Sequence, residues 1–212
     1  MKQATRICIV RHGETDWNAA RRMQGQIDIP LNAAGQAQAA ATAAGLAEQR
    51  FDAVYSSDLL RTWQTARPIA AAAGLEVTAA PGLRERHYGR MQGLTAIEAQ
   101  KLCPEVHAAY AGRDPHHDLD GGESLTVFAA RISATLGELV EAHTGETVLL
   151  VAHGGVLDIV YRMATGRDLS SPRDFPIPNA GLNWIEHDGA NWKLTAWGDR
   201  THLEGSLDEV AG

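Results

Sequence analysis

The chain has 212 residues, of which 44% are hydrophobic and 21% charged, and its formal net charge is −7. This length suits one large α/β domain, and the acidic balance argues against nucleic-acid binding, which usually needs a basic surface. No stretch approaches the roughly 20 apolar residues of a membrane span, and the first residues lack the apolar core of about 7–15 residues of a secretion signal. We therefore expect a cytoplasmic protein with a single domain, residues 1–212, and neither nucleic-acid nor membrane partners.

The first part of the chain predicts strands that alternate with helices. A strand at residues 6–11 precedes an irregular segment at 13–31, and Asn32 is a suitable N-cap for a long helix that runs to about Arg50. The pattern then predicts a strand at 52–57, a helix at 59–73 and a weak strand at 75–78.

The middle of the chain is richer in loops. Residues 81–93 form a predicted loop, and we expect a helical insertion over about 94–122, with helices at 95–102 and 104–112 and a polar loop from 113. A long amphipathic helix is expected at 124–143, because apolar residues recur on one of its faces.

The last part of the chain returns to strands. A strand at 147–152 and a helix at 155–164 precede two alternating strands at 181–187 and 191–197, which are joined by a hairpin turn. The complete order predicts an α/β fold: a three-layer α/β/α sandwich with a mostly parallel sheet and a C-terminal antiparallel hairpin.

Two of the predicted strands end in His-Gly. Arg11-His12-Gly13 follows the first strand, and His153-Gly154 follows the strand at 147–152. If these strands are parallel neighbours, both imidazoles lie in the crevice where open α/β sheets bind ligands. A neutral imidazole is a competent nucleophile toward phosphorus, and the adjacent guanidinium disfavours the imidazolium and can bind phosphate oxygens.

Two further residues suit the same crevice. Arg61 lies in the first turn of the helix at 59–73, where the helix dipole disfavours a cation unless an anion is bound nearby. Glu85 lies between Arg84 and Arg86 in the loop at 81–93. A carboxyl group held near a phosphate has a raised pKa and can protonate a departing alkoxide.

Five motifs, in order and at consistent spacing, resemble the histidine phosphatase superfamily, also called phosphoglycerate-mutase-like. The resemblance covers residues 11 to about 155. The motifs are Arg11-His12-Gly13-Glu14-Thr15-Asp16-Trp17-Asn18, Ser57-Asp58-Leu59-Leu60-Arg61-Thr62 with Gln64-Thr65-Ala66, Leu83-Arg84-Glu85, Gly121-Gly122-Glu123-Ser124 and Val151-Ala152-His153-Gly154-Gly155.

The resemblance implies a phosphoglycerate-mutase-like fold and a role for each site residue. His12 would be the phospho-accepting nucleophile and Glu85 the proton donor, while Arg11, Arg61 and His153 would form the phosphate pocket. The further residues on the phosphate side would be Asn18, Gln24, Gly25 and Gly154. The family needs no metal or other cofactor, so the expected activity is a metal-independent phosphomonoesterase that acts through phosphohistidine on a small phosphorylated metabolite.

The main alternative is a cofactor-dependent phosphoglycerate mutase, which 2,3-bisphosphoglycerate would prime. Residues 85–89 with 92–94 resemble the mutase version of the motif that contains Glu85. Three features of the mutases are absent from this chain: a lysine where it has residues 95–98, an arginine pair where it has only Arg113, and Gly-Asn where it has Gly154-Gly155. Since a mutase must hold phosphoacid anions, the missing cations favour the phosphatase.

The polar loop at 113–120 allows several interpretations. Its acidic and histidine residues could bind a metal, but their spacing matches no established ligand pattern. A solvated loop is favoured, with a substrate-contacting lid as the alternative, and the residues expected to form a substrate loop are Arg86, Tyr88 and His116.

Two other functional classes are less well supported. A non-catalytic phospho-ligand-binding protein would lack His12 or Glu85, and both are present. A partner-binding domain would expose an apolar stripe, and the candidates are Trp184, Trp192 and Trp197. Their alternation is more typical of core packing, or of the edge of a homodimer.

Overall fold

The computed structural model describes residues 4–204, so both ends of the predicted domain lie outside the described residues. Its sheet has six strands in the order β3-β2-β4-β1-β5-β6. The strands are β1 (Thr5–Arg11), β2 (Ala53–Ser56), β3 (Val77–Ala79), β4 (Thr147–Ala152), β5 (Leu182–His187) and β6 (Trp192–Asp199). The first four are parallel, and β5 and β6 form the antiparallel hairpin, as the sequence predicts.

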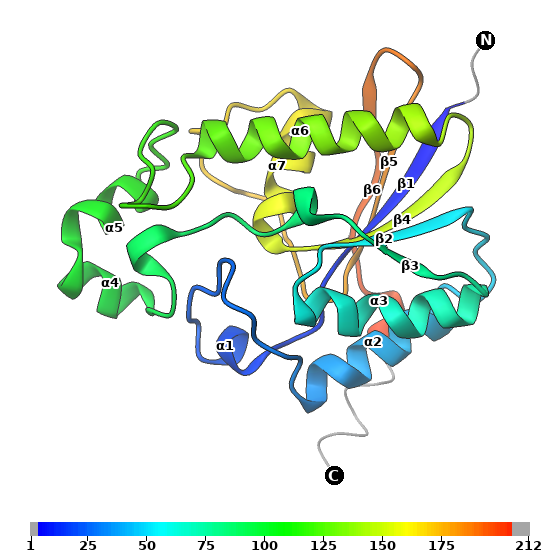
Figure 1. The fold of residues 1–212 in the computed structure, drawn as a ribbon, viewed down its shortest axis with the longest axis horizontal. Coiled ribbons are helices and arrows are strands. Elements are labelled where there is room, and N and C mark those ends of the chain that lie inside the picture. Colours follow the sequence, from blue (N-terminus) through cyan, green and yellow to red (C-terminus); the bar gives the residue numbers. More distant parts are fainter. Residues whose placement is uncertain (1–3, 205–212) are drawn as a thin grey trace.

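Helices cover both faces of this sheet (Figure 1). The helices α2 (Ala33–Gly45) and α3 (Leu60–Ala73) cover one face, and α6 (Leu125–Ala142) and α7 (Gly154–Thr165) cover the other. Alternate residues of β1 serve the two layers: Ile7 and Ile9 pack in the α6–α7 core, whereas Cys8 and Val10 pack in the α2–α3 core. The predicted three-layer α/β/α sandwich is therefore confirmed.

The insertion forms a cap at one end of the molecule (Figure 1). It contains α4 (Ala96–Leu102) and α5 (Pro104–Ala111) and has a small core of its own, built from Met91, Ala99, Cys103, Val106 and Leu119. A short helix α1 (Asp16–Ala19) and 3₁₀ turns η1 (Pro81–Leu83), η2 (Gly89–Met91) and η3 (Thr201–Leu203) complete the secondary structure.

The structure corrects the end of the long helix predicted after Asn32. The helix ends at Gly45 rather than near Arg50, since the chain turns there to bury Leu46 and Phe51. At Gly45 the side chain of His202 lies so close that a Cβ would come within 2.6 Å of it. The segment at 13–31 also contains the unpredicted α1, which begins with a capping box formed by Thr15 and Asn18.

The three tryptophans are half-buried and pack against the two cores, so the core-packing interpretation is confirmed. Trp184 stacks on Phe51, with 6.2 Å between ring centroids, and Trp197 contacts Tyr161 and Phe175. Within residues 4–204 no helix combines the length and the apolar character that crossing a membrane requires.

Candidate active site

The two His-Gly strand ends meet. β1 and β4 are parallel neighbours with Arg11 paired to Ala152, so the residues that follow, His12 and His153, emerge together. Their ring centroids are 5.3 Å apart, and both side chains are buried. The adjacency inferred from the sequence is thus observed.

Local contacts fix the tautomer and the charge of the His12 imidazole. Its Nδ1 donates to the carbonyl of Gly13 at 2.7 Å, so in the neutral ring the lone pair is on Nε2. Burial, and then the charges of Arg61 and Arg11, hold the pKa of His12 well below its usual value. His12 is therefore neutral at neutral pH, which is the form a nucleophile requires.

His153 is also kept neutral, because burial and the Arg61 charge hold its pKa well below the usual range. Its Nε2 lies 2.9 Å from Oγ of Ser57, the residue that follows β2. Its Nδ1 is buried without a hydrogen bond to any described residue. His153 does not line the cavity beside His12 but packs edge-on against the His12 ring.

Two arginines supply the positive charge. Arg61, fully buried in the first turn of α3, donates to the carbonyl of Gly25 at 2.7 Å and to that of Ile27 at 3.0 Å. Arg11 donates to the carbonyl of Ile177 at 2.7 Å. Burial lowers the pKa of Arg61 to about 10, so it remains a cation at neutral pH. The Nε atoms of both arginines are buried without an acceptor among the described residues, as expected where an anion binds.

Glu85 belongs to the loop between η1 and η2 and lines the same cavity. Its Oε2 accepts a hydrogen bond from the Gly155 amide at 2.9 Å, and its Oε1 accepts one from the Arg86 amide at 2.7 Å. Burial raises the pKa of Glu85, although both amides and the nearby cations oppose this. A Cβ on Gly155 would collide with Oε1, so the glycine allows the carboxyl group to dock on α7.

The Glu85 loop is clamped from α6. Arg131 forms an ion pair with Glu123 at 2.8 Å and donates to the carbonyls of Gly82 and Arg84 at 2.8 and 2.9 Å. Glu123 also accepts from the His87 amide at 2.9 Å. The Gly-Gly-Glu-Ser motif therefore contributes a residue that holds the loop, a role that sequence reasoning missed.

The cavity beside His12 has a volume of about 330 Å³. Among the residues singled out from the sequence, its lining includes Arg11, His12, Asn18, Gln24, Gly25, Arg61, Glu85, Tyr88 and Gly154. Arg86 lines an adjoining cavity instead. His116 is exposed and lines neither of these two cavities, and its amide donates to Asp114 in a local turn.

Sequence reasoning missed the segment that follows α7. Arg173, Phe175 and Ile177 line the cavity, and Asn179 donates to the carbonyl of His12 at 2.8 Å. A signal was present in the sequence, because this loop contains three prolines, which stiffen a connection.

The polar loop at 113–120 makes turn contacts. Asp114 accepts from the amides of His116 and His117 at 2.8 and 3.3 Å. In the part of the chain that the structure describes, no three His, Cys, Asp or Glu residues are grouped so that they could hold a metal ion.

Comparisons with known proteins assign the family. The chain is 43% identical over 202 residues to phosphoglycerate mutase-like protein 4 of Arabidopsis thaliana, covering 93% of this chain and 86% of the relative. It is 40% identical over 206 residues to the metal-independent phosphoserine phosphatase of Arabidopsis thaliana, covering 95% and 84%. The solved structure of a mycobacterial glucosyl-3-phosphoglycerate phosphatase superposes with a TM-score of 0.84 at 32% identity, covering 93% of this chain and all of the other. Residues 7–200 match the model of the histidine phosphatase superfamily (branch 1), and the chain therefore belongs to that superfamily.

Proposed function

We propose that this protein is a phosphatase that hydrolyses the phosphomonoester of a small metabolite through a phosphohistidine on His12, without a metal. The observation that carries this proposal is the buried, neutral imidazole of His12, held by the Gly13 carbonyl between two arginines with unpaired Nε donors and facing Glu85. A relative named as a metal-independent phosphatase supports the absence of a metal requirement.

In the first step, Nε2 of His12 attacks phosphorus in line with the ester oxygen. The P–N bond forms while the P–O bond breaks, and the leaving alkoxide takes the proton of Glu85. Arg11 and Arg61 compensate the negative charge on the non-bridging oxygens. The raised pKa of Glu85 keeps this proton available at a pH where an ordinary carboxyl group has lost it.

In the second step, water occupies the place of the departed alcohol. The Glu85 carboxylate takes a proton from the water as its oxygen attacks phosphorus, and the P–N bond breaks. Inorganic phosphate leaves, His12 is neutral again and Glu85 is again protonated, so the cycle closes.

The second candidate activity is phosphoglycerate mutase, in which a hydroxyl group of the substrate replaces water. The similarity to a phosphoglycerate mutase-like protein supports it. So does one observation: Arg86, Arg113 and Arg173 line the cavity that adjoins the phosphate pocket. These arginines could replace the mutase cations that the sequence lacks, so the absence of those cations favours the phosphatase less strongly than the sequence indicates.

One experiment separates the two activities. The protein is incubated in EDTA with 3-phosphoglycerate, with and without 2,3-bisphosphoglycerate, and with p-nitrophenyl phosphate, while phosphate release and 2-phosphoglycerate formation are followed. We expect phosphate release without isomerisation, abolished in His12→Ala. Isomerisation stimulated by the bisphosphate would support the mutase, and activity that persists in His12→Ala would reject both.

A further inference from the structure

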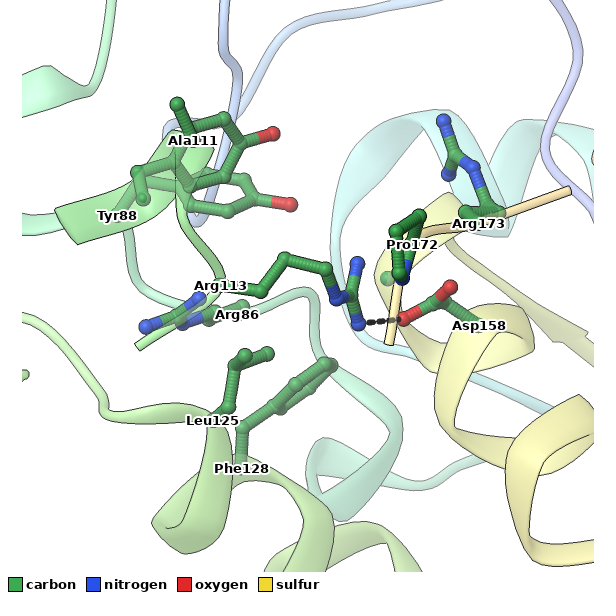
Figure 2. Close-up of a pocket in the computed structure, with 11 residues that line it drawn as sticks. Arg86, Tyr88, Ala111, Arg113, Leu125, Phe128, Asp158, Pro172 and Arg173 are labelled. Atoms are coloured by element: carbon green, nitrogen blue, oxygen red, sulfur yellow. Dashed lines mark hydrogen bonds and ion pairs between the residues drawn. The ribbon is translucent and has the colours of Figure 1, made fainter. Parts of the chain in front are cut away.

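A second cavity of about 310 Å³ adjoins the phosphate pocket. Tyr88, Gly155 and Arg173 line both cavities, so the two share a wall. The remainder of the second cavity comes from the loop between η1 and η2, the cap, α6, α7 and the loop after α7. Arg86, Arg113, Leu125, Phe128 and Asp158 are among its lining residues (Figure 2). A phosphate ester bound at His12 would place its alcohol portion in or beside this space.

The charges around this cavity do not balance. Arg113 is paired with Asp158 at 2.7 Å (Figure 2). Asp158 also contacts Arg162 at 3.1 Å. Arg86 is buried, and its Nε and Nη2 donate to the carbonyls of Glu123 and His117. It forms no ion pair within residues 4–204, although the charges of the Glu123 and Glu85 carboxylates act on it. Glu123 is itself paired with Arg131, so the buried guanidinium of Arg86 shares its counter-charge and gains from a further anion that can reach it.

Arg173 is a further cation at this cavity. Its guanidinium has neither an ion pair nor a hydrogen bond to any residue the structure describes, whereas the next residue, Asp174, is paired with Arg167. The side chain is exposed at the junction of the two cavities. Its charge acts on Arg11 and Tyr88, which line the phosphate pocket, so the guanidinium lies within electrostatic reach of that pocket.

The loop that carries Arg173 is anchored on both sides. Before it, Arg162 donates to Oγ of Ser171 at 2.7 Å, and Arg113 donates to the carbonyl of Leu169 at 2.8 Å. After it, the Phe175 ring stacks on Tyr161, with 3.7 Å between centroids. These contacts position the backbone of Arg173, which lowers the entropy lost when its side chain binds a ligand.

We propose that Arg173 and Arg86 bind a carboxylate on the alcohol portion of the substrate, so that the preferred esters are phosphorylated small hydroxy acids or amino acids. This inference rests on the proposed phosphatase function. A planar carboxylate matches the forked donors of a guanidinium, and it needs fewer donors than a second phosphate. Arg86 has already given two of its donor atoms to backbone carbonyls, which favours the smaller anion.

The test compares pairs of esters that differ at the carboxylate. The value of kcat/KM is measured for O-phosphoserine against O-phosphoethanolamine, and for 3-phosphoglycerate against glycerol 3-phosphate. We expect the protein to prefer the carboxylated member of each pair about 10- to 100-fold, the range for one charged hydrogen bond. In Arg173→Gln and Arg86→Gln this preference should fall toward one, mainly through KM, and Arg173→Lys should retain part of it.

Arg67→Gln is the matched control, because Arg67 is exposed on α3, lines neither cavity and loses the same charge. The inference would be overturned if Arg173→Gln kept the preference for carboxylated esters as fully as Arg67→Gln does. It would also be overturned if the unchanged protein showed no such preference. Failure of the proposed function looks different: no phosphate would be released from any ester, p-nitrophenyl phosphate included. Because Arg173 makes no contact that folding depends on, a thermal midpoint close to that of the unchanged protein is expected for Arg173→Gln.

Discussion

The two adjoining cavities are built in different ways. In the phosphate pocket, His12, Arg61 and Gly154 lie at strand ends and first helical turns, where the sheet and backbone carbonyls fix them. Glu85 and the residues after α7 reach the same pocket from loops. The second cavity is assembled from the cap, the start of α6 and the loop after α7, which side-chain contacts such as Arg113–Asp158 hold together. In the proposed function, the nucleophile and the phosphate-binding cations therefore depend on the sheet, whereas the cavity for the alcohol portion depends on contacts between separate parts of the chain.

The largest effect should come from the phosphate pocket. His12→Ala removes the attacking nitrogen, so we expect kcat to fall at least about 10⁴-fold with every ester, and no acid-labile phosphoryl label to form. His153→Ala should slow turnover less, by about 10²-fold, and keep the label, because His153 does not line the cavity. Steady-state rates and rapid-quench labelling measure both, and a full label on His12→Ala would place the nucleophile elsewhere.

Glu85→Gln tests the proton donor and should act on alkyl esters more than on p-nitrophenyl phosphate, whose leaving group needs no proton. We expect a loss of about 10²- to 10³-fold with an alkyl phosphate. In the proposed first step Glu85 acts in its protonated form, and its pKa is raised, so activity should persist above the usual pH range of a carboxyl group and then decline as the pH rises. The pH profile of kcat/KM should lose this decline in the variant, and an unchanged profile would assign the proton to another group.

Gly155→Ala should displace Glu85 without removing it, because the added Cβ would collide with Oε1. We expect kcat for an alkyl phosphate to fall about 10-fold, the effect of a misplaced catalytic group, with little change in KM. Gly137→Ala is a suitable control, since nothing lies within 4 Å of a Cβ built there. Equal rates for the two variants would show that Glu85 tolerates the shift.

The smallest effect is expected at the second cavity's anchor. Arg113→Gln removes the contacts to Asp158 and to the Leu169 carbonyl, so the loop that carries Arg173 should lose part of its support. We expect the preference for carboxylated esters to fall about 3-fold through KM, because Arg173 itself remains, and the free energy of unfolding to fall by about 1–3 kcal/mol. Denaturant unfolding measures the change in stability, and kcat/KM for the ester pairs measures the change in preference. A loss in kcat without a change in KM would contradict the expected loss of support for Arg173.

Much of the phosphate pocket is predictable from the sequence. The strand ends at His12 and His153 are expected to be neighbours, and the β1–β4 register shows that they are. Local rules suffice because the side chains follow directly on strands or open a helix, where the backbone fixes their direction. The same rules misplace the end of the long helix, since the burial of Leu46 and Phe51 decides where α2 stops.

The second cavity is largely invisible in the sequence. Arg86 and Tyr88 are expected near the substrate and line it, whereas His116 is expected there and lies exposed. Arg173 escapes prediction because the nearby prolines mark a stiff loop but do not show which of its side chains faces a cavity. Its position depends on Arg162 and Arg113, whose contacts join the cap, α7 and the loop after it.

The order of strands and helices, the family and the group of residues around His12 can be read from the sequence alone. Those features follow from periodic burial and from motifs on strand ends, which are local in the chain. Which cations have an ion-pair partner becomes visible only in the folded structure. Charge balance depends on partners far apart in sequence, such as Arg113 with Asp158, and spacing alone cannot reveal them.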